Sequence, residues 1–247
     1  MSHPLLGFRS SRLWSRLSDL RHLQRNRARR RFLAGFIGRN DLVFDIGANV
    51  GHFALVARSL GAEVVAVEPQ AALADQVRRR FAGSPKVHVL QCALGSSPGT
   101  ATLHKTAALS EVASLRHDPG VLSRFSKVHP FTLSESVEVR TLEDLIARHG
   151  RPDFCKIDVE GHESQVLEGL RTAIAKVSFE FNREYRDDAG RCLALLSALG
   201  PYRFNYALGE DTRLAEPRWL GAGQVAASVW ARPDPLLWGD IYARIDP

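Results

Sequence analysis

The chain has 247 residues, of which 45% are hydrophobic and 24% charged, and its formal net charge is +6. These values are typical of a soluble protein with one domain-sized core, and the absence of any run of about 18 apolar residues argues against a membrane-spanning helix. The three cysteines are widely separated, which argues against a disulfide framework and favours a reducing, cytoplasmic location.

The positive charge is concentrated near the N-terminus. Residues 1–40 contain ten arginines and one acidic residue, so they carry a charge of +9 while the rest of the chain carries −3. Within residues 9–31, leucines at helical spacing are surrounded by arginines, which predicts a basic amphipathic helix. We expect residues 1–31 to be an arm that leads into the domain. There are two alternatives. Residues 9–31 could contact nucleic acid or an anionic membrane, or they could be an organellar presequence.

After residue 41, short β-rich apolar runs alternate with helical stretches, which is the pattern of an α/β fold with a mainly parallel sheet. The runs are almost continuously apolar, as expected for strands that are covered on both faces. The predicted strands are 42–46, 63–68, 86–91, 154–159, 177–181, 202–206 and 225–230. The predicted helices are 52–59, 71–81, 142–149, 163–170 and 189–199.

We therefore predict one α/β domain at residues 32–231, built on a seven-stranded, mostly parallel sheet with helices on both faces. The alternation is interrupted at residues 106–135, which we interpret as an insertion or lid. This segment lies between two short predicted strands at 100–104 and 137–140. Residues 232–247 are expected to form a C-terminal tail.

The first predicted strand runs into a glycine-rich turn. Its sequence is Asp45-Ile46-Gly47-Ala48-Asn49-Val50-Gly51. Glycines allow such a turn to approach a ligand closely, at the carboxyl end of the strand where open α/β sheets bind ligands. A dinucleotide loop would read GxGxxG and would need no acid before its first glycine. The carboxylate of Asp45 would repel a pyrophosphate but attract an ammonium group, such as the methionyl amine of S-adenosylmethionine.

A second acid closes the next predicted strand. Glu68 follows Gly51 by 17 positions, where its carboxylate can accept hydrogen bonds from both hydroxyls of a ribose. Each acid alone has a structural alternative, since Asp45 can cap a helix or a turn and Glu68 can be a solvated strand end. Together they favour a cationic, unphosphorylated adenosine ligand.

The strand predicted at 154–159 carries a second charged motif. Lys156, Asp158 and Glu160 alternate with apolar residues, so a period of two places them on one face of the strand. Because burying them without partners would be costly, we expect the strand to end here, with Asp158 and Glu160 facing the ligand crevice. As structural alternatives, Lys156 can pair with an acid and Glu160 can cap the next helix.

These residues also suggest a chemistry. If a methyl group is transferred to an alcohol, positioning supplies much of the acceleration and a base accepts the hydroxyl proton. Asp158 or His162 is the candidate base, and Glu160 would orient the acceptor. We assign no metal ligands; a metal-assisted variant would use Asp158, Glu180 and Asn182 as oxygen ligands.

Several motifs together resemble the FkbM-type methyltransferases over about residues 32–181. They are the glycine-rich turn, Glu68-Pro69, Ala93-Leu94-Gly95, the run Lys156-Ile157-Asp158-Val159-Glu160-Gly161-His162-Glu163, and Val166-Leu167-Glu168-Gly169. The resemblance implies a class I S-adenosylmethionine-dependent methyltransferase fold, which is Rossmann-like with a final antiparallel strand, and O-methylation of a sugar or natural-product hydroxyl. The cofactor-binding residues expected from these motifs are Asp45, Gly47, Ala48, Asn49, Gly51, Glu68, Pro69, Cys92 and Ala93.

The sequence thus predicts an S-adenosylmethionine-dependent O-methyltransferase that acts on a hydroxyl of a small-molecule or carbohydrate-like acceptor. Its expected catalytic residues are Asp158, Glu160 and His162. One alternative is an NAD(P)-type nucleotide-binding oxidoreductase. The other is a non-catalytic methyltransferase-like module that is recruited to a partner through its basic arm.

Overall fold

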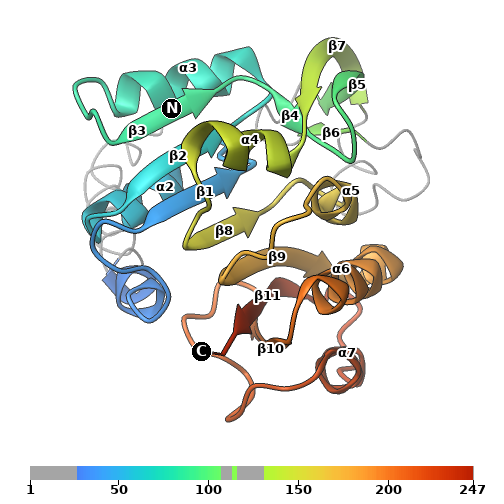
Figure 1. The fold of residues 1–247 in the computed structure, drawn as a ribbon. Helices are drawn as coiled ribbons and strands as arrows, with labels where there is room; N and C mark the ends of the chain where they lie inside the picture. The colour runs from blue at the N-terminus through green and yellow to red at the C-terminus, as the bar shows by residue number, and fades with distance from the viewer. Residues whose placement is uncertain (1–26, 107–112, 116–130, 247) are drawn as a thin grey trace, which may run out of the picture.

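The computed structural model describes residues 27–106, 113–115 and 131–246. A seven-stranded sheet with the order β10-β11-β9-β8-β1-β2-β3 forms its centre (Figure 1). Its strands are β1 (Leu42–Ile46), β2 (Glu63–Val67), β3 (Val87–Leu90), β8 (Phe154–Ile157), β9 (Lys176–Asn182), β10 (Tyr202–Leu208) and β11 (Trp238–Ile245). The α/β fold class is therefore confirmed.

Strand direction follows the prediction as well. Strand β1 pairs in parallel with β2 and β8, and β9 continues the parallel set from β8. The last strand, β11, lies between β9 and β10 and is antiparallel to both. The sheet is mostly parallel with a final antiparallel strand, as the resemblance implied.

Helices cover both faces of the sheet (Figure 1). They are α2 (His52–Ser59), α3 (Ala71–Arg80), α4 (Leu142–His149), α5 (Glu163–Glu168), α6 (Arg186–Leu199) and α7 (Ala222–Trp230), with a 3-10 turn η1 (Arg183–Tyr185). One core cluster joins one sheet face to α4, α5, α6 and α7. The other joins the opposite face to α2, α3 and an N-terminal helix at residues 27–33. Because side chains alternate along a strand, Phe44 lies in the first cluster and Val43 in the second.

A smaller sheet with the order β4-β7-β5-β6 lies beside the main one (Figure 1). It consists of β4 (Ala93–Leu94), β5 (Gly99–Thr106), β6 (Ala113–Ser114) and β7 (Phe131–Arg140). The predicted strands at 100–104 and 137–140 belong to β5 and β7, which pair in antiparallel fashion. Most of the predicted insertion or lid, at 107–112 and 116–130, lies outside the described residues.

The C-terminal part of the prediction is wrong. Residues 225–230 belong to helix α7 rather than to a strand, and the seventh strand is β11, within the segment expected to be a tail. The buried residues Val225 and Val229 stand four positions apart, which is helical spacing. β11 was missed because polar residues, including Asp240, interrupt its apolar pattern.

The N-terminal boundary also needs correction. Residues 27–33 form one helix, so the predicted border between an arm and a domain at residue 31 falls inside it. Leu33 is 2% exposed and belongs to the core. Residues 1–26, and with them most of the proposed contact surface for nucleic acid or membrane, lie outside the described residues. In the described ranges no helix combines the length and apolar character needed to cross a bilayer.

Candidate active site

A cavity of about 390 Å³ opens at the carboxyl ends of the parallel strands. Open α/β sheets bind ligands at this edge. It brings together most of the predicted site residues, namely Gly47, Ala48, Asn49, Glu68, Pro69, Cys92, Ala93, Asp158, Glu160 and His162. Two predicted cofactor residues, Asp45 and Gly51, are not among those that line it.

The glycine-rich turn owes its shape to two left-handed glycines. A Cβ atom on Gly47, whose φ is +78°, would lie 1.8 Å from the carbonyl oxygen of Asp158. Gly51 is the N-cap of α2 with a φ of 79°, and an added Cβ would crowd the side chains of Val77 and Phe81. Gly47 therefore allows the glycine-rich turn to contact the loop that holds Asp158. Gly51 instead allows the turn to pack against Val77 and Phe81, which do not line the cavity.

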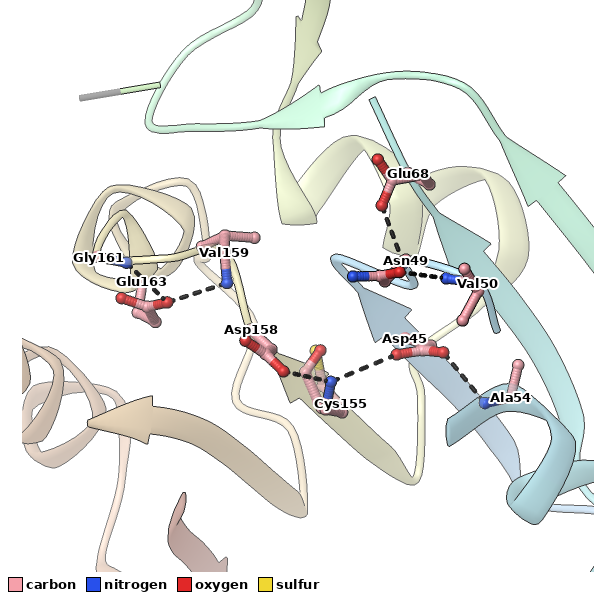
Figure 2. Close-up of polar contacts among 11 residues, drawn as sticks. Asp45, Asn49, Val50, Ala54, Glu68, Cys155, Asp158, Val159, Gly161 and Glu163 are labelled. Carbon is pink, nitrogen blue, oxygen red and sulfur yellow. Dashed lines mark hydrogen bonds and ion pairs between the residues drawn. The ribbon is translucent and has the colours of Figure 1, made fainter. Parts of the chain in front are cut away.

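Glu68 is held at the end of β2 with its carboxylate facing the cavity. Its Oε2 accepts a hydrogen bond from the backbone N–H of Asn49 at 2.9 Å (Figure 2). Its Oε1 accepts one from the backbone N–H of Gln70 at 2.9 Å. The side chain is buried, and burial raises the pKa of Glu68 to about 7. A carboxylate oxygen has a second lone pair, so Glu68 is fixed and can still accept hydrogen bonds from hydroxyl groups.

Asp45 is placed differently from the prediction. It is fully buried; its Oδ2 accepts a hydrogen bond from the N–H of Ala54 in α2, and its Oδ1 lies 4.0 Å from Nζ of Lys156. Burial raises the pKa of Asp45 to about 6, although the charge of Lys156 opposes the shift. Direct contact of Asp45 with a ligand is not supported by this position, because the side chain lies behind the cavity wall.

Lys156 lies between two acids. Its Nζ donates a hydrogen bond to Oδ2 of Asp158 at 2.8 Å and lies 5.5 Å from the ring centre of Phe53. Burial alone would lower the pKa of Lys156, but the charges of Asp158 and Asp45 outweigh it and raise the value. Figure 2 shows the carboxylates of Asp45 and Asp158 directed toward each other. The alternative that Lys156 pairs with an acid is confirmed.

The loop after β8 carries the three predicted catalytic residues and is held in shape by Glu163. The carboxylate of Glu163 accepts hydrogen bonds from the N–H groups of Val159 at 2.9 Å and Gly161 at 3.2 Å (Figure 2). Glu160 has a left-handed φ of 55°, which is uncommon for a residue with a side chain. Glu163 is only 2% exposed, and burial raises its pKa to about 8. Sequence reasoning missed this role of Glu163.

Three acidic groups, two from the loop after β8 and one from β9, meet in the cavity. Carboxylate oxygens of Asp158, Glu160 and Glu180 all lie within 4.8 Å of one another, which is close enough to share a cation. Burial raises the pKa of Glu180 well above its usual range, and the nearby charges of Asp158 and Glu160 add to the shift. Asn182, the third oxygen ligand considered from the sequence, instead caps η1 by accepting from the N–H of Tyr185.

The cavity also has walls that sequence reasoning missed. They come from the N-terminal helix, from the loop after β10 and from β11, and comprise Arg29, Phe32, Leu33, Gly209, Glu210, Asp211, Thr212, Trp238, Asp240 and Tyr242. No short motif marks these residues. One feature of the sequence could have indicated them: Trp238, Asp240 and Tyr242 stand at every second position, which places all three on one face of a strand.

Comparison with known proteins identifies the relatives of this chain. The model of a family described as "Methyltransferase FkbM domain" matches residues 45–204. The hexuronic acid methyltransferase AglP of Haloferax volcanii is 26% identical over 144 residues, which are 57% of this chain and 54% of that protein. The methyltransferase sdnD of Sordaria araneosa is 29% identical over 161 residues, 53% of this chain and 61% of that protein. The chain thus spans little more than half the length of these curated relatives.

Among solved structures, precorrin-6y C5,15-methyltransferase from Geobacter metallireducens is similar at 12% identity, with 88% of this chain and 87% of that chain covered and a TM-score of 0.45.

Proposed function

The chain belongs to the FkbM methyltransferase family, and from this premise we propose that it transfers the methyl group of S-adenosylmethionine to a hydroxyl of a small, carbohydrate-like acceptor. The observation that carries the proposal is that one cavity holds both the glycine-rich turn with Glu68 and the loop with Asp158 and His162. The relative whose name states a hexuronic acid substrate supports an acceptor of carbohydrate type.

The nucleoside end of the cavity fits the cofactor. Gly47, Ala48 and Asn49 supply backbone that a ligand can approach closely, and Glu68 offers two fixed carboxylate oxygens to a ribose. Cys92 and Ala93 line the cavity after β3, where they would contact the base. When bound, S-adenosylmethionine supplies an electrophilic methyl group on a positively charged sulfur.

The other end of the cavity fits the acceptor. Asp158, whose side chain is 34% exposed, or His162 would accept the hydroxyl proton, and Glu160 would orient the acceptor. Lys156 fixes Asp158 through its 2.8 Å hydrogen bond. We assign Asp45 the role of holding Lys156 from the opposite side, in place of the predicted contact with a methionyl amine. Asp45 and Lys156 are thus positioning residues.

Calorimetry separates this function from the oxidoreductase alternative. The protein is titrated with S-adenosylhomocysteine and, separately, with NAD. We expect S-adenosylhomocysteine to bind and NAD to give no heat of binding, because the turn lacks the GxGxxG spacing for a pyrophosphate. Binding of NAD alone would refute the proposed function.

Transfer itself is tested with S-adenosylmethionine labelled in its methyl group and a panel of small carbohydrates. We expect the labelled methyl group to appear in at least one carbohydrate. The rate of methyl transfer should be much lower in Asp158→Asn if Asp158 is the base, or in His162→Gln if His162 is the base. If S-adenosylhomocysteine binds but no hydroxyl compound in cell extracts gains a methyl group, the chain is a non-catalytic module instead.

A further inference from the structure

The acceptor end of the cavity is built mostly from segments outside the family match at 45–204. Its walls include the N-terminal helix with Arg29, the loop 209–212, and three residues of β11. These segments are therefore where this chain can differ from its relatives in the acceptor that it binds.

Three carboxylates lie in a row across adjacent strands at this end. In the sheet, Lys156 of β8 pairs with Ser178 of β9, and Glu180 of β9 pairs with Asp240 of β11. Asp158 follows Lys156 by two positions and Glu180 follows Ser178 by two positions, so Asp158 and Glu180 lie on the same face of the sheet. Asp240 lies on that face too, because it is directly opposite Glu180. We call Asp158, Glu180 and Asp240 the carboxylate row. With neighbouring strands about 4.8 Å apart, the row can contact one small group from several sides.

The row lacks sufficient positive charge. Lys156 contacts Asp158 and is shared with the buried Asp45. Within the described ranges, Glu180 and Asp240 accept no hydrogen bond. The positive charges that act on Asp240 are those of Arg29 and of Lys156, which Asp158 and Asp45 share. Removing a carboxylate from water costs free energy unless a cation or a hydrogen-bond donor binds it.

The rim of the cavity is acidic too. Glu210 and Asp211 line it, and among the described lining residues Arg29 is the single guanidinium. Trp238 lines the same wall, and the face of an aromatic ring attracts cations. An acceptor with a carboxylate would add like charge to this wall, whereas one with an ammonium group would neutralise it.

We propose that the acceptor carries an ammonium group near the hydroxyl that is methylated, as in an amino sugar, and that Glu180 and Asp240 bind this group. An ammonium has three donors and no acceptor, which matches carboxylates that accept no hydrogen bond from the part of the chain that the structure describes. The inference rests on the proposed function and narrows it, because it favours an amino sugar over a uronic acid.

The test uses the full chain saturated with S-adenosylhomocysteine and four monosaccharides: glucosamine, N-acetylglucosamine, glucose and glucuronic acid. Calorimetry near neutral pH measures the dissociation constant of each. We expect glucosamine to bind about tenfold or more tighter than N-acetylglucosamine and glucose, since a charge-assisted hydrogen bond is lost in both, and glucuronic acid to bind most weakly.

Variants locate the effect. Asp240→Asn and Glu180→Gln should each abolish most of the preference for glucosamine over glucose. The matched control is Asp75→Asn, which removes the same charge from the exposed face of α3, where Asp75 pairs with Arg78, and it should keep the preference.

Three results would overturn the inference: equal binding of glucosamine and glucose, tighter binding of glucuronic acid, or no binding of glucosamine. A fourth is sugar binding that requires added magnesium and disappears with a chelator, which would assign Asp158, Glu160 and Glu180 to a metal ion instead. The titration with S-adenosylhomocysteine keeps the two proposals apart. Its failure would refute the methyltransferase function, whereas binding without any preference for the amine refutes only the acceptor class.

Discussion

At the scale of single residues, Gly47 lies where the backbone of the glycine-rich turn packs against that of the loop after β8. We expect Gly47→Ala to destabilise the fold by more than about 3 kcal/mol, because its Cβ would overlap the carbonyl oxygen of Asp158 in addition to straining a positive φ. Gly83→Ala is the matched control, since Gly83 has a φ of +80° but no atom within 4 Å of an added Cβ. Denaturant unfolding measures both; a similar loss of stability in the two variants would contradict the steric account.

Glu68 is expected to determine cofactor affinity. Glu68→Gln should weaken binding of S-adenosylhomocysteine by about 1–3 kcal/mol, because an amide cannot accept from Asn49 and Gln70 on both sides and still serve a ribose. Calorimetry measures the change, and Glu138→Gln, at the exposed surface, serves as the control. Equal affinity in the Glu68 and Glu138 variants would remove Glu68 from the cofactor site.

Glu163 is expected to act on turnover through the shape of the loop. In Glu163→Ala the N–H groups of Val159 and Gly161 lose their acceptor, so turnover should fall by about tenfold or more while affinity for S-adenosylhomocysteine stays within about twofold. Glu163→Gln keeps an oxygen acceptor and should recover most of the rate. A parallel fall in cofactor affinity would mean that Glu163 only stabilises the fold.

Some site residues could be predicted from sequence because each follows directly on a recognisable strand. Glu68 and Asp158 were found in this way, and both line the cavity. The buried position of Asp45 beside Lys156 could not be predicted, because the residue spacing does not show that Lys156 on the neighbouring strand lies next to it. Asp240 was missed, since its pairing with Glu180 joins positions far apart in the chain.

At the scale of elements, β11 is an inner strand of the sheet although it is nearly the last segment of the chain. It forms the ladders to both β9 and β10, and its residue Ile241 is 1% exposed. A chain that ends after residue 231 is therefore expected to lose cooperative thermal unfolding, because β10 would lose its pairing partner. Circular dichroism on heating tests this. A truncated chain that still unfolds in one sharp transition would contradict the placement of β11.

The elements that sequence predicted best are those with a single clear period. Strand β1 and helices α2 and α4 have the predicted bounds, because apolar residues dominate β1 and helical spacing or a capping box marks the helices. The errors lie at α7 and β11. The face of β11 that lines the cavity includes the acidic residue Asp240, so β11 lacks the continuous apolar sequence of a strand that is covered on both faces.

At the scale of the whole molecule, buried acids couple stability to pH. Burial raises the pKa values of Asp45 and Asp240 to about 6, of Glu68 to about 7 and of Glu163 to about 8. The folded state therefore binds more protons than the unfolded state, so these groups stabilise most below their unfolded pKa values, and this stabilisation is lost as pH rises through 6 to 8.

We accordingly expect the melting temperature of the ligand-free protein to fall between about pH 5.5 and pH 8. Glu68→Gln removes one titrating group and should make the decline shallower, whereas Glu138→Gln should leave it unchanged. Differential scanning calorimetry across this range measures both slopes. A melting temperature that rises with pH would contradict the raised pKa values of these four carboxyl groups.

The most direct test of the whole account is a crystal structure of the protein with S-adenosylhomocysteine. We predict that the ribose hydroxyls contact Glu68, that the glycine-rich turn passes beneath the nucleoside, and that the sulfur faces the loop of Asp158 and His162. A saturated complex in which the nucleoside binds elsewhere, or in which Glu68 and the turn contact no part of it, would contradict the account.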